Sequence, residues 1–220
     1  MSHARANRVS AKFLTAQQVA SLNTRKLPKG LEVYRCHARE MRDSTGSLIA
    51  QGPWFFASSV GRFDLAPPRG TLNLAAGPIG AVCEALGALT LNEEIPIQEV
   101  SRRVLVSLPL PEEFTVADFT DRQATRMARI LPAEMSGPAA NYEGFQSLAA
   151  SVDQAGLSGI CSRLRFSVPE AELGYFIFGK AGPRKWAQGQ ELPISDVLIS
   201  LGYSITNDED LPLSEIDFRA

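Results

Sequence analysis

The chain has 220 residues, a formal net charge of −2, a hydrophobic content of 45% and a charged content of 21%. These values are typical of a globular protein with one sizeable core. No apolar run approaches the roughly 18 residues that a membrane-spanning helix needs, and the basic N-terminus lacks the apolar region of a secretory signal. We therefore expect a soluble, cytoplasmic protein that does not contact a membrane.

The residues that most often bind metals or act as nucleophiles are few and scattered. The chain has three cysteines and two histidines, at Cys36, Cys83, Cys161, His3 and His37. This spacing supports neither a disulfide framework nor a metal site, so we expect the cysteines to be small buried hydrophobic residues. A Ser-His-Asp mechanism would depend on His37 alone.

The charges are unevenly distributed along the chain. The first 42 residues hold nine Lys or Arg and two Glu, whereas the residues from Glu191 to the end hold seven acidic residues and one Arg. Both ends are read either as ordinary polar surface or as a segment that docks a partner. No basic stripe interleaved with aromatic residues is present, so we expect no direct nucleic-acid binding.

The hydrophobic periodicity predicts short strands between a few amphipathic helices. Thr15 is the expected N-cap of the first helix, and Pro78 stands at the start of another, where proline is tolerated. In chain order we expect a helix over residues 15–22, strands over 31–37 and 71–76, a helix from 77, a strand over 100–110, helices over 118–131 and 141–155, strands over 160–166 and 174–179, and a helix over 193–202.

These elements predict a single α+β domain with mixed, twisted β-sheets flanked by helices. Residues 1–30 are expected to form a basic extension with a short helix, and residues 31–220 the domain itself. The aromatic run at residues 54–56 is expected to cover part of the core or to form a wall of a pocket.

One carboxylate is isolated in an apolar part of the chain. Between Arg69 and Glu93 the only formally charged residue is Glu84, in a segment rich in glycine and alanine. On the helix that begins at Pro78, Glu84 lies roughly 170° from the centre of the apolar stripe, beside small residues that permit close approach of a strand or a ligand. The alternative is an ordinary exposed glutamate on a short helix.

Three sequence elements resemble a known family. The elements are Gly61-Arg62-Phe63-Asp64, the segment over residues 70–76, and Ala81-Val82-Cys83-Glu84-Ala85-Leu86-Gly87. Together they resemble the RES domain, the toxin component of bacterial toxin–antitoxin modules, over residues 34–179. The resemblance implies a fold similar to that of ADP-ribosyltransferases, with NAD as a substrate whose nicotinamide–ribose bond is cleaved, no prosthetic group, and a cognate antitoxin as partner.

The resemblance also implies site residues. By position, Arg62, Glu84 and Ser162 match the family's catalytic arginine, glutamate and serine, and Arg35 matches its first arginine. Two arginines suit a pyrophosphate, because a guanidinium binds phosphate oxygens bidentately. From the residues alone, Arg62 can equally form a structural ion pair with an acid such as Asp64, and Ser162 can be an ordinary strand serine.

Position 73 departs from the family pattern. Asn73 stands where the family usually has a tyrosine that is expected to lie against the nicotinamide. Asn73 and Tyr34 are expected at the NAD site, and Tyr34 or the aromatic run at 54–56 can supply an aromatic wall instead. The alternatives to an NAD-degrading enzyme are an ADP-ribosyltransferase that modifies a protein and a catalytically weakened binding protein. The residues leave open whether the chain forms a homo-oligomer.

Overall fold

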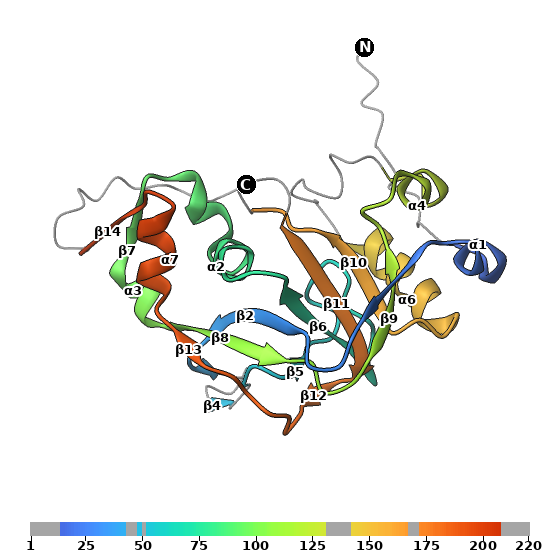
Figure 1. Cartoon of the computed structure of the whole chain (residues 1–220), viewed down its shortest axis with the longest axis horizontal. Coiled ribbons are helices and arrows are strands. Elements are labelled where there is room, and N and C mark those ends of the chain that lie inside the picture. The colour runs from blue at the N-terminus through green and yellow to red at the C-terminus, as the bar shows by residue number, and fades with distance from the viewer. Residues whose placement is uncertain (1–13, 43–47, 50–51, 131–141, 167–171, 208–220) are drawn as a thin grey trace, which may run out of the picture.

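A large mixed sheet forms the centre of the molecule (Figure 1). The computed structural model describes residues 14–42, 48–49, 52–130, 142–166 and 172–207. The strand order is β1–β9–β10–β11–β6–β2–β8–β13, antiparallel except for the parallel pair β9 and β10. The strands are β1 (Thr24–Leu27), β2 (Glu32–Ala38), β6 (Arg69–Ala75), β8 (Arg103–Pro109), β9 (Phe114–Asp118), β10 (Gly159–Arg163), β11 (Leu173–Lys180) and β13 (Glu191–Leu192).

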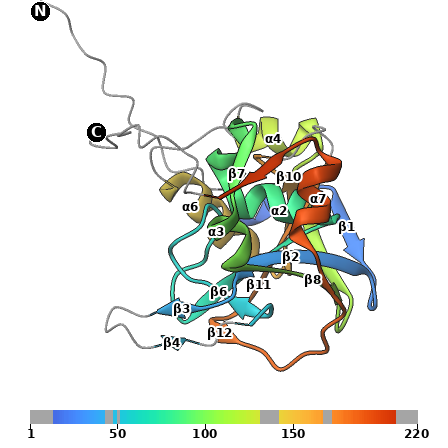
Figure 2. The same ribbon diagram turned by 90° about the vertical axis from the view of Figure 1, so that its left-hand side faces the viewer.

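Helices gather on one side of this sheet, and most of the short strands lie on the other (Figures 1 and 2). The helices are α1 (Ala16–Ala20), α2 (Pro78–Leu86), α3 (Ile97–Ser101), α4 (Arg122–Met127), α6 (Glu143–Gln154) and α7 (Ile194–Ser200), with a 3-10 helix at Gly87–Leu91. The short strands pair as β3 (Met41–Arg42) with β4 (Leu48–Ile49), β5 (Phe55–Phe56) with β12 (Gly182–Pro183), and β7 (Glu94–Pro96) with β14 (Ser204–Thr206).

The sheet is buried on both faces, so the chain has two hydrophobic clusters. Side chains alternate between faces along a strand. On β10, Ile160 therefore belongs to the cluster on the helical side, and Cys161 belongs to the cluster on the other side, with Trp54 and Phe56. We call these the helical face and the tryptophan face. This arrangement confirms the expected α+β class, with a mixed sheet flanked by helices.

Local signals set several boundaries, of which those at Thr15 and Pro78 were predicted. Thr15 caps α1 in a capping box, in which its side chain accepts from the Gln18 amide and the Gln18 side chain accepts from the Thr15 amide. Pro78 occupies the first turn of α2. After α6, Gly156 has a φ of +85°, the left-handed conformation in which glycine ends helices.

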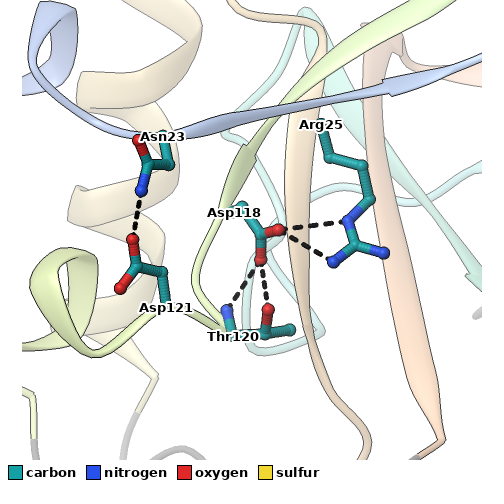
Figure 3. Close-up of polar contacts among 5 residues, drawn as sticks. All are labelled: Asn23, Arg25, Asp118, Thr120 and Asp121. Atoms are coloured by element: carbon teal, nitrogen blue, oxygen red, sulfur yellow. Dashed lines mark hydrogen bonds and ion pairs between the residues drawn. The ribbon is translucent and has the colours of Figure 1, made fainter.

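The prediction of a helix over residues 118–131 was too long, because within the described residues of this range the structure has a helix only at Arg122–Met127. Asp118 is the last residue of β9, and Asp121 caps the short helix α4 by accepting from the Gln123 amide. Figure 3 shows the contacts at the end of this strand: one Asp118 oxygen accepts from the Arg25 guanidinium, at 2.9 Å, and the other accepts from Thr120. These bonds hold the edge strand β1 and the turn after β9 together.

Residues 14–30 are part of the same core as the rest of the domain. Leu14 and Val19 are buried on the helical face, and Leu27 of β1 is buried on the tryptophan face. From residue 14 onward, the expected N-terminal extension thus supplies a helix and the edge strand of the main sheet. Within the described residues, no helix is long and apolar enough to span a bilayer.

Candidate functional site

A pocket of about 220 Å³ opens on the helical face between β2, β6 and α2. Tyr34 opposite Ala75 is the register pair that joins β2 to β6, whereas β6 pairs with β11 along its whole length. The strands beside the pocket therefore diverge, and α2 covers the gap. The lining residues are Tyr34, Arg35, Cys36, Asn73, Leu74, Ala75, Ala81, Glu84, Ala85, Leu164 and Phe176.

Glu84 lies in the wall of this pocket and is held by the main chain of a distant segment. Its Oε1 accepts hydrogen bonds from the backbone amides of Arg165 and Phe166, the latter at 3.1 Å. Both amides follow directly after β10. The half-buried carboxylate is thus fixed in orientation, unlike the exposed glutamate that was the alternative expectation.

The small residues of α2 allow that segment to approach. A methyl group at Gly80 would lie 2.6 Å from Leu164 Cδ1 and 2.7 Å from Glu172 Oε2. Such distances are well inside van der Waals contact, so only glycine accommodates both side chains where they stand. The close approach that the sequence predicted is therefore made by the chain around β10 and β11.

Arg62 does not line the pocket and lies among aromatic rings next to it. It is only 7% exposed, and its Cζ is 4.7 Å from the centroid of the Phe63 ring and 5.6 Å from that of Phe176, which lines the pocket. Burial lowers the pKa of Arg62 to about 10, and the nearby charge of Glu84 acts in the opposite direction. The guanidinium face is thus positioned by cation–π contacts.

The acid that could have paired with Arg62 has other partners. Asp64 Oδ2 accepts from the Gly61 amide at 2.7 Å and from the Val60 amide at 3.2 Å, which closes the turn before β6. Asp64 acts electrostatically on Arg35, whose pKa it raises against a larger lowering by burial. In the described part of the chain, no ion pair joins Arg62 to Asp64.

Arg35 lines the pocket, but its guanidinium is engaged with the main chain. Its Nη1 donates to the carbonyl oxygens of Pro53 and Phe55, at 2.6 and 3.0 Å. Burial lowers the pKa of Arg35 to about 10. Trp54, which lies between these two carbonyls in the chain, belongs to the tryptophan face. The Arg35 guanidinium therefore holds residues 53–55 against that face of the sheet.

Ser162 is fully buried and does not line the pocket. Its Oγ donates to the carbonyl of Arg163 at 3.2 Å. Ser162 lies opposite Gly174, which in turn lies opposite Ala75 in the pocket wall. Leu164 fills the space over Gly174, since a methyl group there would meet Leu164 Cδ2 at 2.5 Å.

Asn73 is exposed in the pocket wall, and Tyr34 lines the wall as well, with its hydroxyl donating to Glu32 Oε2 at 3.1 Å. The aromatic run at 54–56 does not line the pocket. Trp54 is instead buried on the tryptophan face, where its Nε1 donates to the Ala187 carbonyl. The aromatic lining comes from Tyr34 and from Phe176, which the sequence reasoning missed.

Sequence reasoning also missed Arg165. Its guanidinium Nη1 donates to the Tyr142 hydroxyl at 2.8 Å, and its Cζ lies 4.7 Å from the centroid of the Phe166 ring. Arg165 stands 81 residues after Glu84, so no local pattern links the two. Only the docking of the segment after β10 against α2 brings them together.

The cysteines are free thiols. Cys83 and Cys161 are buried as expected, whereas Cys36 is half-buried and lines the pocket. Burial raises the pKa of Cys36 and of Cys161 to about 12, which disfavours the reactive thiolate. Within the described ranges, no group of three or more His, Cys, Asp or Glu residues is placed as metal ligands would be.

Comparison with known proteins identifies the fold but not a family. No family model and no curated protein matches the chain. Among solved structures, the fold is similar to a chain of the M. tuberculosis MbcT–MbcA toxin–antitoxin complex, with a TM-score of 0.59 and 15% sequence identity. The match covers 85% of this chain and 96% of that chain. The molecule therefore shares its architecture with a component of a toxin–antitoxin complex.

Proposed function

We propose that this protein is an NAD-degrading, toxin-like enzyme of the cytoplasm, which cleaves the nicotinamide–ribose bond and is neutralised by an antitoxin. The observation that carries the proposal is the placement of Glu84. Two backbone amides orient this carboxylate in the wall of a pocket, and the Arg62 guanidinium lies over the ring of Phe176, another residue of that wall. The similarity to a chain of a toxin–antitoxin complex supports the antitoxin part of the proposal.

The chemistry of bond cleavage explains why a fixed carboxylate is useful. When the bond between the ribose C1′ and the nicotinamide nitrogen breaks, its electron pair goes to the nitrogen and neutralises the pyridinium. The ribose becomes an oxocarbenium-like cation, which water or phosphate then attacks. A carboxylate that is already oriented stabilises that cation without reorganising, and such contacts are typically worth about 3–4 kcal/mol.

The size of the pocket fits one end of NAD. A volume of about 220 Å³ is below the roughly 300–1,000 Å³ of pockets that enclose drug-sized ligands. We therefore place the nicotinamide and its ribose inside, between Tyr34 and Glu84. The pyrophosphate and the adenosine would lie outside the pocket.

The other site residues take the following proposed roles. Arg62 stabilises negative charge on the substrate beside Glu84. Asn73 and Tyr34 contact the nicotinamide end from the wall. The side chains of Arg35 and Ser162 are both hydrogen-bonded to main-chain carbonyls. That Arg35 contacts the pyrophosphate and that Ser162 contacts the nicotinamide stay predictions.

Release of nicotinamide from NAD by the purified protein tests the proposal. Glu84→Gln should lower the rate at least 100-fold. It should leave the melting temperature nearly unchanged, since the Gln carbonyl oxygen can still accept from both amides. A Glu84→Gln variant as active as wild type would refute the role of Glu84.

Isotopically labelled NAD separates hydrolysis from group transfer. Free ADP-ribose, or its 1″-phosphate when phosphate is supplied, is the expected product. Label on a protein would instead identify an ADP-ribosyltransferase. No turnover together with a stable protein complex would identify a binding protein, the outcome that the exposed Asn73 in place of a tyrosine favours.

A further inference from the structure

A second arginine, Arg165, stands in the segment after β10 and contacts Glu84 through its backbone amide. Arg62 precedes β6 in the chain, so the two arginines come from distant segments. The pKa of Arg62 is lowered mainly by burial; Glu84 raises it, and the positive charge of the Arg165 side chain has a smaller lowering effect. Of these three charged residues, Glu84 lines the pocket, whereas Arg62 and Arg165 contact lining residues, Arg62 through the Phe176 ring and Arg165 through its amide to Glu84.

The Arg165 side chain is held in place by neutral groups. Its Nη1 donates to the Tyr142 hydroxyl at 2.8 Å, and its plane lies near the Phe166 and Tyr142 rings, with Cζ 4.7 and 5.9 Å from their centroids. Among the described residues, no carboxylate forms an ion pair with it. A guanidinium has five N–H donors, so most of its donors are available to an anion.

We propose that Arg165 is a substrate-binding residue that, together with Arg62, binds a phosphate of the dinucleotide where it leaves the pocket beside Glu84. This inference rests on the proposed function and adds a residue to it. Tyr142 is a positioning residue, because its hydroxyl accepts a hydrogen bond from the guanidinium and fixes it. Phosphate suits this place because paired guanidinium groups bind phosphate oxygens bidentately.

Arg165→Gln tests the inference, with Arg163→Gln as the matched control. Both variants remove one positive charge from the same segment, and Arg163 is exposed at the end of β10. For NAD cleavage, Arg165→Gln should raise KM about 10- to 100-fold, as expected for loss of a charged hydrogen bond, and change kcat less than threefold. The control should behave as wild type.

Binding measurements give a readout that does not need turnover. By calorimetry, Arg165→Gln should weaken ADP-ribose binding about 10- to 100-fold and leave nicotinamide binding unchanged. Tyr142→Phe should weaken ADP-ribose binding by a smaller factor. If Arg165→Gln does not fold, Arg165→Lys replaces it, because lysine keeps the charge but loses the bidentate geometry and should still raise KM.

The outcomes separate this inference from the proposed function. Normal NAD cleavage by Arg165→Gln with wild-type KM overturns the inference alone. A fall in kcat with unchanged KM overturns it too, because Arg165 would then act only through the amide that holds Glu84. Binding of ADP-ribose that depends on Arg165, without nicotinamide release by wild type, supports the inference and overturns the proposed enzyme.

Discussion

Arg35 and Arg62, which were both predicted to bind the substrate, differ in the partners of their guanidinium groups. Both are buried strongly enough to lower their pKa to about 10. Arg35 directs its guanidinium to the carbonyls of Pro53 and Phe55, on the tryptophan face. Arg62 rests on the rings of Phe63 and Phe176 beside Glu84, on the helical face. A buried arginine bonded to carbonyls supports the fold, whereas one on aromatic rings beside a carboxylate can serve a ligand.

The largest expected effect is on stability, from Arg35→Met. The substitution leaves two carbonyls without their donor, and each unsatisfied buried acceptor costs about 1–3 kcal/mol. We expect the free energy of unfolding to fall by about 2–5 kcal/mol, measured by urea denaturation. If the Arg35→Met protein is as stable as wild type and has a raised KM for NAD, Arg35 binds the substrate and does not differ from Arg62 in role.

In contrast to Arg35→Met, Arg62→Met should affect activity more than stability. Methionine is compatible with the surrounding Phe63, Phe145 and Phe176 rings, so we expect a smaller loss of stability than in Arg35→Met. Nicotinamide release should fall about 100-fold, which corresponds to about 2.7 kcal/mol of transition-state stabilisation. Equal activity in the variant and in wild type would show that Arg62, like Arg35, is structural.

Arg25 adds a third case, an arginine paired with an acid. Burial alone would raise the pKa of Asp118, but hydrogen bonds from Thr120 and Arg25 outweigh it and hold the pKa below its usual value. This stabilisation is present above the unfolded-state pKa of about 3.9 and is lost as the pH falls through the lower folded-state value. Asp118→Asn should therefore cost about 1–2 kcal/mol at pH 7.

The pH dependence of the stability loss shows whether it comes from the charge on Asp118. In urea denaturation, the difference between wild type and Asp118→Asn should shrink as the pH falls below about 4. A difference that stays constant down to pH 2 would mean that the cost comes from packing and not from the charge on Asp118.

The smallest effect concerns the pocket wall. Asn73 is exposed, so Asn73→Tyr should change stability by no more than about 0.5 kcal/mol. If the native enzyme is weakened by the lack of an aromatic side chain here, nicotinamide release should rise about tenfold. Unchanged or lower turnover would show that Tyr34 and Phe176 already supply the aromatic lining.

Much of the fold could be predicted because its signals are local. The Thr15 capping box, Pro78 at the start of α2 and Gly156 after α6 act within a few residues. The strand that ends at Asp118 was missed, because its alternating pattern over 114–118 is short and adjoins a helix-like stretch. There the pairing with β1 and β10 decided the conformation.

The site was predicted only in part, for a physical reason. Glu84 could be found because a lone carboxylate on an apolar helix is visible in the sequence. The direction of the Arg35 side chain depends on which face of β2 packs under α2, and strand alternation alone allows either choice. Arg165 meets Glu84, and Tyr142 meets Arg165, through contacts between distant segments, which leave no periodic signal.

The two amides that hold Glu84 are synthesised much later than Glu84 itself. They lie 81 and 82 residues after the carboxylate. A ribosome that has made the chain only as far as α6 has already supplied β2, β6 and α2, which carry Tyr34, Asn73 and Glu84. The carboxylate still lacks its two amide donors at that stage. If the proposed activity is correct, the nascent chain is harmless until β10 and the segment after it emerge, which gives an antitoxin time to bind.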